Sequence, residues 1–184
     1  MTVIAEEAGF RLTQMQMPDG KMVELRVPIL PAPTEEVARK ALSSFDYDHS
    51  IAGVVYSMMG GSATQRLYSL YEVKEFLQKP EEAIDPLEMR HDKIGFVDFG
   101  LLASWIDEVI EDHELAAAVR DVAAQESVYG KAMPFIKELL QERLAACKEC
   151  LAEDDPKTEA PAGAEDVTGP AMRTQDELPG EKGV

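Results

Sequence analysis

The chain has 184 residues, of which 45% are hydrophobic, and a formal net charge of −17. Its length suits one domain with an appendage, and its hydrophobic content is sufficient for a packed core. The negative charge would repel nucleic-acid phosphates and anionic membrane surfaces, so we expect neither as a partner; a basic protein or a cation fits better, unless the charge serves only solubility.

The N-terminal residues and the cysteine pattern indicate a cytoplasmic protein. The first ten residues, MTVIAEEAGF, lack the basic region and apolar stretch of a signal peptide, and no apolar run is long enough for a membrane span. The two cysteines are three positions apart, too close for a disulfide that would stabilise a secreted domain. We therefore expect a soluble protein of the cytoplasm without membrane contact.

Residues 10–27 are expected to form a β-hairpin. Two short apolar segments flank Pro18-Asp19-Gly20, in which proline and glycine favour the backbone angles of a tight turn. Because an isolated hairpin is unstable in water, it must pack on the rest of the chain or pair at its free edge. The apolar positions that alternate along the two strands are Phe10 and Leu12 on the first, and Val23, Leu25 and Val27 on the second.

From Thr34 onward the sequence is expected to be mainly helical. Thr34 can cap a helix with its side chain, and the acidic residues that follow it in the first turn favour the helix dipole. The apolar run 50–59 predicts a buried helix, with a buried strand as the alternative. Ser62 followed by Gln65 forms a capping-box pattern, which predicts a helix over residues 62–78. The stripe of that helix would contain Leu67, Leu70, Tyr71, Lys74 and Leu77.

Further helices are expected between residues 85 and 152. Asp85-Pro86 predicts the start of a short helix, residues 93–99 a short strand, and Asp98 the cap of the next helix. A last helix is predicted over residues 131–152. Apolar residues recur at helical spacing in three series: Leu102, Trp105, Ile106, Val109 and Ile110; Leu115, Val119 and Val122; and Ile136, Leu140, Leu144, Cys147 and Leu151.

The composition changes after residue 152. Residues 153–184 contain nine acidic and three basic residues, four prolines, four glycines and no aromatic residue. Such a segment cannot bury enough apolar surface to offset the entropy of ordering. We therefore predict a mainly α (α+β) fold: a single multi-helix domain over residues 1–152 with an N-terminal β-hairpin, followed by a disordered acidic C-terminal tail over residues 153–184.

Cys147 and Cys150 form a Cys-x-x-Cys pair, a spacing found in redox and metal sites. Reactive thiols usually lie at helix N-termini, where the dipole stabilises the thiolate, whereas this pair is near an acidic helix C-terminus. A zinc site would need two more ligands, for which His49 is a candidate. Cys147 falls on the apolar stripe of the last helix, so we interpret it as a core residue. A metal site at Cys147, Cys150 and His49 is the less favoured alternative.

No motif points to a catalytic or cofactor site. Gly60-Gly61-Ser62 precedes a predicted helix but lacks the spacing of the nucleotide-binding glycine motifs. Ser57 lacks the flanking glycines of a nucleophile elbow, and no serine, histidine and aspartate form a local catalytic pattern. We therefore expect no cofactor, and the sequence argues against an enzyme without excluding one.

The strongest functional candidate is an acidic cluster between residues 107 and 114. Like charges lie four positions apart on a predicted helix, which costs about 0.2–0.5 kcal/mol per pair. Such an unfavourable arrangement can mark a docking surface for a basic partner, although a solvated helix face is the commoner reason for acidic residues. The cluster consists of Asp107, Glu108, Glu111, Asp112 and Glu114.

These observations favour a cytoplasmic, non-catalytic accessory or adaptor protein that binds another protein through an acidic surface. The alternative is a metal- or cofactor-binding protein, an enzyme included, with its site among the helices. Size and acidity also fit a small assembly chaperone of the phage type, but no residue is diagnostic of one.

Overall fold

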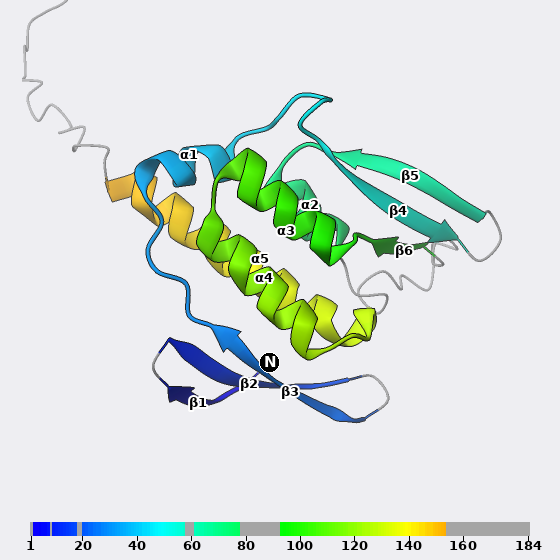
Figure 1. Cartoon of the computed structure of the whole chain (residues 1–184), viewed down its shortest axis with the longest axis vertical. Helices are drawn as coiled ribbons and strands as arrows, with labels where there is room; N and C mark the ends of the chain where they lie inside the picture. Colours follow the sequence, from blue (N-terminus) through cyan, green and yellow to red (C-terminus); the bar gives the residue numbers. More distant parts are fainter. Residues whose placement is uncertain (1, 8, 18–19, 58–60, 78–92, 154–184) are drawn as a thin grey trace, which may run out of the picture.

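The computed structural model describes residues 2–7, 9–17, 20–57, 61–77 and 93–153. These residues form an α+β fold in which two small antiparallel sheets flank a group of helices (Figure 1). The N-terminal sheet consists of β1 (Thr2–Glu7), β2 (Phe10–Gln16) and β3 (Met22–Pro28), and the second sheet of β4 (Ile51–Ser57), β5 (Gly61–Leu67) and β6 (Lys93–Phe96). The helices are α1 (Glu35–Leu42), α2 (Leu70–Phe76), α3 (Phe99–Trp105), the π-helical turn η2 (Ile106–Ile110), α4 (His113–Gln125) and α5 (Tyr129–Glu153).

The expected N-terminal hairpin is confirmed as strands β2 and β3 of a three-stranded sheet. Its register sets Thr13 opposite Leu25, and the face that contains this pair is buried. Phe10 and Leu12 lie on the opposite face, because side chains alternate along a strand. The sequence did not reveal β1, which pairs with the outer edge of β2. The buried residues of the sheet are Thr13, Met15, Val23, Leu25 and Val27.

Strand β4 corrects the helix expected over residues 50–59. It pairs antiparallel with β5 on one side and with β6 on the other, so the strand considered as the alternative is the structure found. The β-branched Val54 and Val55 pack well on a pleated sheet, and a short apolar run has no period that separates helix from strand. β6 confirms a short strand at the start of the range expected, residues 93–99, but it ends at Phe96, and Phe99 already belongs to α3.

The helix expected over residues 62–78 is also wrong in its first half, which forms β5. Helix α2 starts only after Ser69, whose hydroxyl accepts a hydrogen bond from the Glu72 amide at 3.1 Å. The capping-box pattern of Ser62 and Gln65 is local, and the pairing of all seven β5 residues with β4 outweighs it. The stripe residues Leu67, Leu70 and Leu77 are nevertheless buried.

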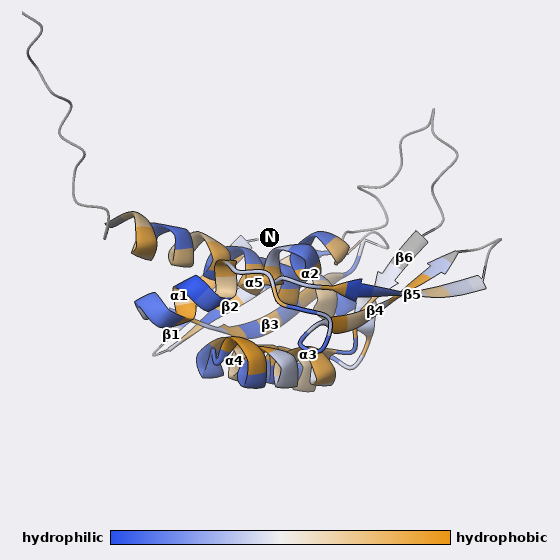
Figure 2. Cartoon of the chain, turned by 90° about the horizontal axis from the view of Figure 1, so that it is seen from above, coloured by the Kyte–Doolittle hydropathy of each residue, from blue (hydrophilic) through white to orange (hydrophobic). Residues whose placement is uncertain are grey.

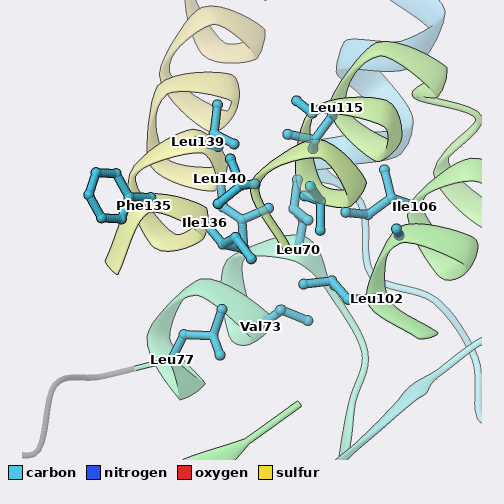
Figure 3. Packing of buried hydrophobic residues seen from close by; sticks show 14 of the residues in the cluster. Leu70, Val73, Leu77, Leu102, Ile106, Leu115, Phe135, Ile136, Leu139 and Leu140 are labelled. Carbon is cyan, nitrogen blue, oxygen red and sulfur yellow. The ribbon is translucent and has the colours of Figure 1, made fainter. Parts of the chain in front are cut away.

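The helical second half agrees with the expected caps and apolar series. Thr34 caps α1 and Asp98 caps α3, each by accepting a backbone amide three residues further on. η2 and Glu111, which has a φ of 63°, connect α3 to α4. The helices share one hydrophobic core, in which Figure 3 labels Leu70 and Val73 from α2, Leu77 directly after α2, Leu102, Ile106 and Leu115, and Phe135, Ile136, Leu139 and Leu140 from α5.

The described elements form three adjoining parts: the N-terminal sheet, the group of helices and the second sheet. α1 packs on α5, α4 contacts both α5 and β3, and α2 and α3 contact the second sheet. Both views show β4 and β5 projecting from the helices (Figure 1 and Figure 2). Among the described residues, no helix is long and apolar enough to cross a membrane. The helix start predicted at Asp85-Pro86 and the tail predicted beyond Glu153 lie outside the described residues.

Candidate functional site

The predicted acidic cluster lies at the connection between η2 and α4. Asp107 and Glu108 belong to η2, Glu111 and Asp112 form the connection, and Glu114 is in the first turn of α4. The five residues therefore share one corner of the molecule, but their environments differ.

Asp112 is a buried structural residue. Its side chain accepts the Leu115 amide at 3.1 Å, which caps α4, and only 1% of the residue is exposed. Arg143 donates from Nε and Nη2 to its two oxygens at 2.6 and 2.8 Å, a bidentate geometry. Nη1 of Arg143 donates to the Pro31 carbonyl at 2.6 Å. The Asp112–Arg143 pair therefore holds α4, α5 and the segment before α1 together, and Asp112 is shielded from solvent.

Asp107 is partly exposed and Glu111 is exposed, and both are paired within the chain. Oδ1 of Asp107 lies 2.5 Å from Nδ1 of His113, and Oδ2 accepts a hydrogen bond from Nη2 of Arg120 at 2.7 Å. Nζ of Lys40 lies 2.6 Å from Glu111. The His113 hydrogen bond, followed by that of Arg120, lowers the pKa of Asp107, and the Lys40 hydrogen bond lowers the pKa of Glu111. Both carboxylates therefore stay ionised, and the repulsion expected between them is offset by these cations.

Glu108 and Glu114 are exposed, and neither forms an ion pair with another described residue. Together with Asp107 and Glu111 they form the acidic corner, the name used below for these four residues. The corner is what remains of the predicted five-residue surface once the buried Asp112 is set apart.

Sequence reasoning missed the three cations that organise this region. Lys40 comes from α1, and nothing in the sequence connects it with Glu111. Arg120, from α4, lies thirteen positions beyond Asp107. Arg143 had a signal, because it follows Leu140 by three positions and precedes Cys147 by four, and so lies beside the apolar stripe of α5. A charged residue at such a position requires a buried counter-charge, which Asp112 provides.

The cysteine pair and His49 occupy different surroundings. Cys147 is fully buried, and burial raises the pKa of its thiol to about 11. Cys150 is half-buried and donates from Sγ to the Pro33 carbonyl at 3.5 Å. His49 lies in the exposed loop before β4, where its carbonyl accepts the Trp105 indole N–H at 2.6 Å. Within the described ranges, no three His, Cys, Asp or Glu side chains form a group that could hold a metal ion.

A cavity of about 160 Å³ is lined by residues 29–32 and by side chains from β2 and α5. Arg11 and Arg143 both line it. However, Nη2 of Arg11 lies 2.5 Å from Oε2 of Glu142, and Arg143 forms an ion pair with Asp112. The charges around the cavity therefore balance, which gives it no preference for a charged ligand.

No family model, no curated protein and no solved structure matches this chain. The functional interpretation therefore depends on the chain's own residues, among which the acidic corner is the best candidate.

Proposed function

We propose that the chain is a cytoplasmic, non-catalytic accessory or adaptor protein that binds a basic protein partner through the acidic corner. The observation that supports this function is the exposure of Glu108 and Glu114 beside two carboxylates that their neighbours keep ionised. Glu108 and Glu114 attract lysine and arginine side chains, whereas Asp107 and Glu111 already have cationic partners within the chain. The net charge of −17 adds a long-range attraction that would accelerate the encounter.

Glu108 and Glu114 are expected to make the direct contacts. A cation of the partner would have to compete with His113 and Arg120 for Asp107, and with Lys40 for Glu111. The two exposed glutamates gain a charge partner without losing one. The buried Asp112 fixes the backbone next to them, so the partner need not order this segment on binding.

A binding measurement on the full chain tests the proposal. Partner proteins captured from the source cells with the tagged chain are purified, and their affinity is measured for the wild type and two double variants. E108K/E114K reverses two charges of the acidic corner. E6K/E24K reverses two exposed charges on the N-terminal sheet and changes the net charge by the same amount. We expect about tenfold weaker binding by E108K/E114K and little change for E6K/E24K.

Two results would contradict the proposal. Unchanged affinity of E108K/E114K would exclude the acidic corner as the binding surface. An equal loss in both double variants would show that the overall charge attracts the partner without any local site.

A further inference from the structure

The outer edge of the second sheet, strand β5, is open to solvent. β5 is an end strand in the order β5-β4-β6, and residues 61–66 of its seven residues are exposed. Figure 1 and Figure 2 show it on the hairpin that projects from the helices. An end strand has backbone amides and carbonyls that point outward, and these can pair with another strand.

The other three sheet edges have features that oppose such pairing. β1 has a register shift between Val3 and Ala5 and carries the exposed Glu6. At β3, the side chain of Gln125 from α4 binds the Arg26 N–H and carbonyl at 2.9 and 2.8 Å. β6 has only four residues. Bulges, charged residues, coverage by a helix and short length all protect sheet edges.

β5 has fewer of these features, because a single charged residue lies near its C-terminal end. It contains no proline and no acidic residue, pairs with β4 without a register shift, and has Arg66 as its one charged residue. Another segment meets this edge just beyond Leu67, where the Phe45 amide donates to the Tyr68 carbonyl at 2.7 Å. Before that contact, from Gly61 to Leu67, no described strand pairs with the outer edge of β5.

We propose that β5 pairs with the β5 strand of a second copy of the chain, antiparallel and around a two-fold axis at Thr64. The two second sheets would then form one continuous sheet across the dimer. In such a pair, residues equally distant from Thr64 lie opposite each other, so this register pairs all seven residues. Ser62 faces the second copy's Arg66, and Thr64 faces its own counterpart.

Charge and side-chain pairing both favour this register. The two Arg66 guanidinium groups face small neutral Ser62 residues, and cross-strand threonine pairs are favourable. An axis at Arg66 would instead oppose two positive charges and leave most of the strand unpaired. The net charge of −17 on each copy opposes association at long range, but β5 itself contributes no negative charge to the interface. The open edge is thus complementary to itself.

Disulfide trapping tests this register. Thr64→Cys places two cysteines directly opposite each other, with Cα atoms about 4.5–5.5 Å apart, a distance that a disulfide can span. Ser62→Cys is the matched control, because its two copies would lie four residues apart along the strands, about 13 Å. Both variants are made in the full chain with Cys150→Ser, while the buried Cys147 is retained.

Under mild oxidation we expect a covalent dimer from Thr64→Cys and about tenfold less from Ser62→Cys, because only the first pair is within disulfide distance. Sedimentation of the wild type should show a concentration-dependent monomer–dimer equilibrium. Thr64→Lys, which opposes two ammonium groups at the axis, should shift that equilibrium to the monomer. A wild-type monomer at every concentration, equal crosslinking of both cysteine variants, or capture of another protein's strand by monomeric chain would each overturn the proposal.

Discussion

At the scale of single residues, Asp112 has two structural roles, because it caps α4 and neutralises the buried Arg143. Asp112→Ala should lower the free energy of unfolding by about 3–5 kcal/mol, since Arg143 would remain buried without a counter-charge and the cap would be lost. Urea unfolding measures the change. Glu114→Ala, at an exposed position of the same helix, should change stability by less than about 0.5 kcal/mol. Similar stabilities of the two variants would contradict the structural role of Asp112.

The two thiols should differ in reactivity. Cys147 is buried and its thiol has a pKa of about 11, whereas Cys150 is half-buried. A thiol reagent at pH 8 should therefore modify Cys150 in the native protein and reach Cys147 only after unfolding. Counting modified thiols before and after denaturation checks this, and modification of both in the native state would contradict it. Burial raises the pKa of the Cys147 thiol from 9.0 to about 11, so the unfolded chain ionises this thiol before the folded chain does. The free energy of unfolding should therefore decrease as the pH rises from 9 to 11.

At the scale of elements, α2 packs against the second sheet at two glycines, Gly53 and Gly95. A Cβ at Gly95 would lie 2.5 Å from the Phe76 carbonyl oxygen, so backbone would have to shift. Gly95→Ala should therefore destabilise the protein by about 1–3 kcal/mol. A Cβ at Gly130 in α5 would meet nothing within 4 Å, and Gly130→Ala should be neutral or stabilise the helix by up to about 1 kcal/mol. Thermal unfolding of the two variants provides the comparison, and equal melting temperatures would contradict the close approach at Gly95.

The elements that could be predicted from the sequence are those with local signals. Asp98 caps α3, and the apolar series of α3, α4 and α5 repeats over several turns, so both signals agree. β4 was only the alternative to an expected helix and β5 was missed, because strand pairing is not local: Val54 lies opposite Thr64 on one side and Phe96 on the other. Ser62 and Gln65 do match a capping box, but the ladder to β4 decides the conformation there.

At the scale of the whole molecule, the acidic corner could be predicted only in part. The exposure of Glu108 and Glu114 could be expected, because their neighbours are acidic in the sequence itself. The burial of Asp112 depends on Arg143 from α5, and the pairing of Glu111 depends on Lys40 from α1. These contacts exist because α1 packs on α5 and α4 contacts both α5 and β3, an arrangement without a signal in the linear chain.

Salt should act in opposite directions on the two proposed surfaces. Between about 0.1 and 1 M NaCl the Debye length falls from about 10 Å to 3 Å. Binding of a basic partner to the acidic corner should weaken, because its attraction to the negative surface is screened. Self-association through β5 should strengthen over the same range, because screening reduces the repulsion between two chains of charge −17 while the interface itself contains no acidic residue.

Sedimentation at both salt concentrations, with the partner's affinity measured in parallel, separates these effects. Thr64→Lys should remain monomeric at low salt, where its added charges repel most strongly, and should still bind the partner as the wild type does. E108K/E114K should bind the partner about tenfold more weakly, and its dimer should be at least as stable as that of the wild type because the net charge is smaller. A dimer that dissociates on addition of salt would show that an ionic contact holds the two copies together, and the β5 edge would then not be the interface.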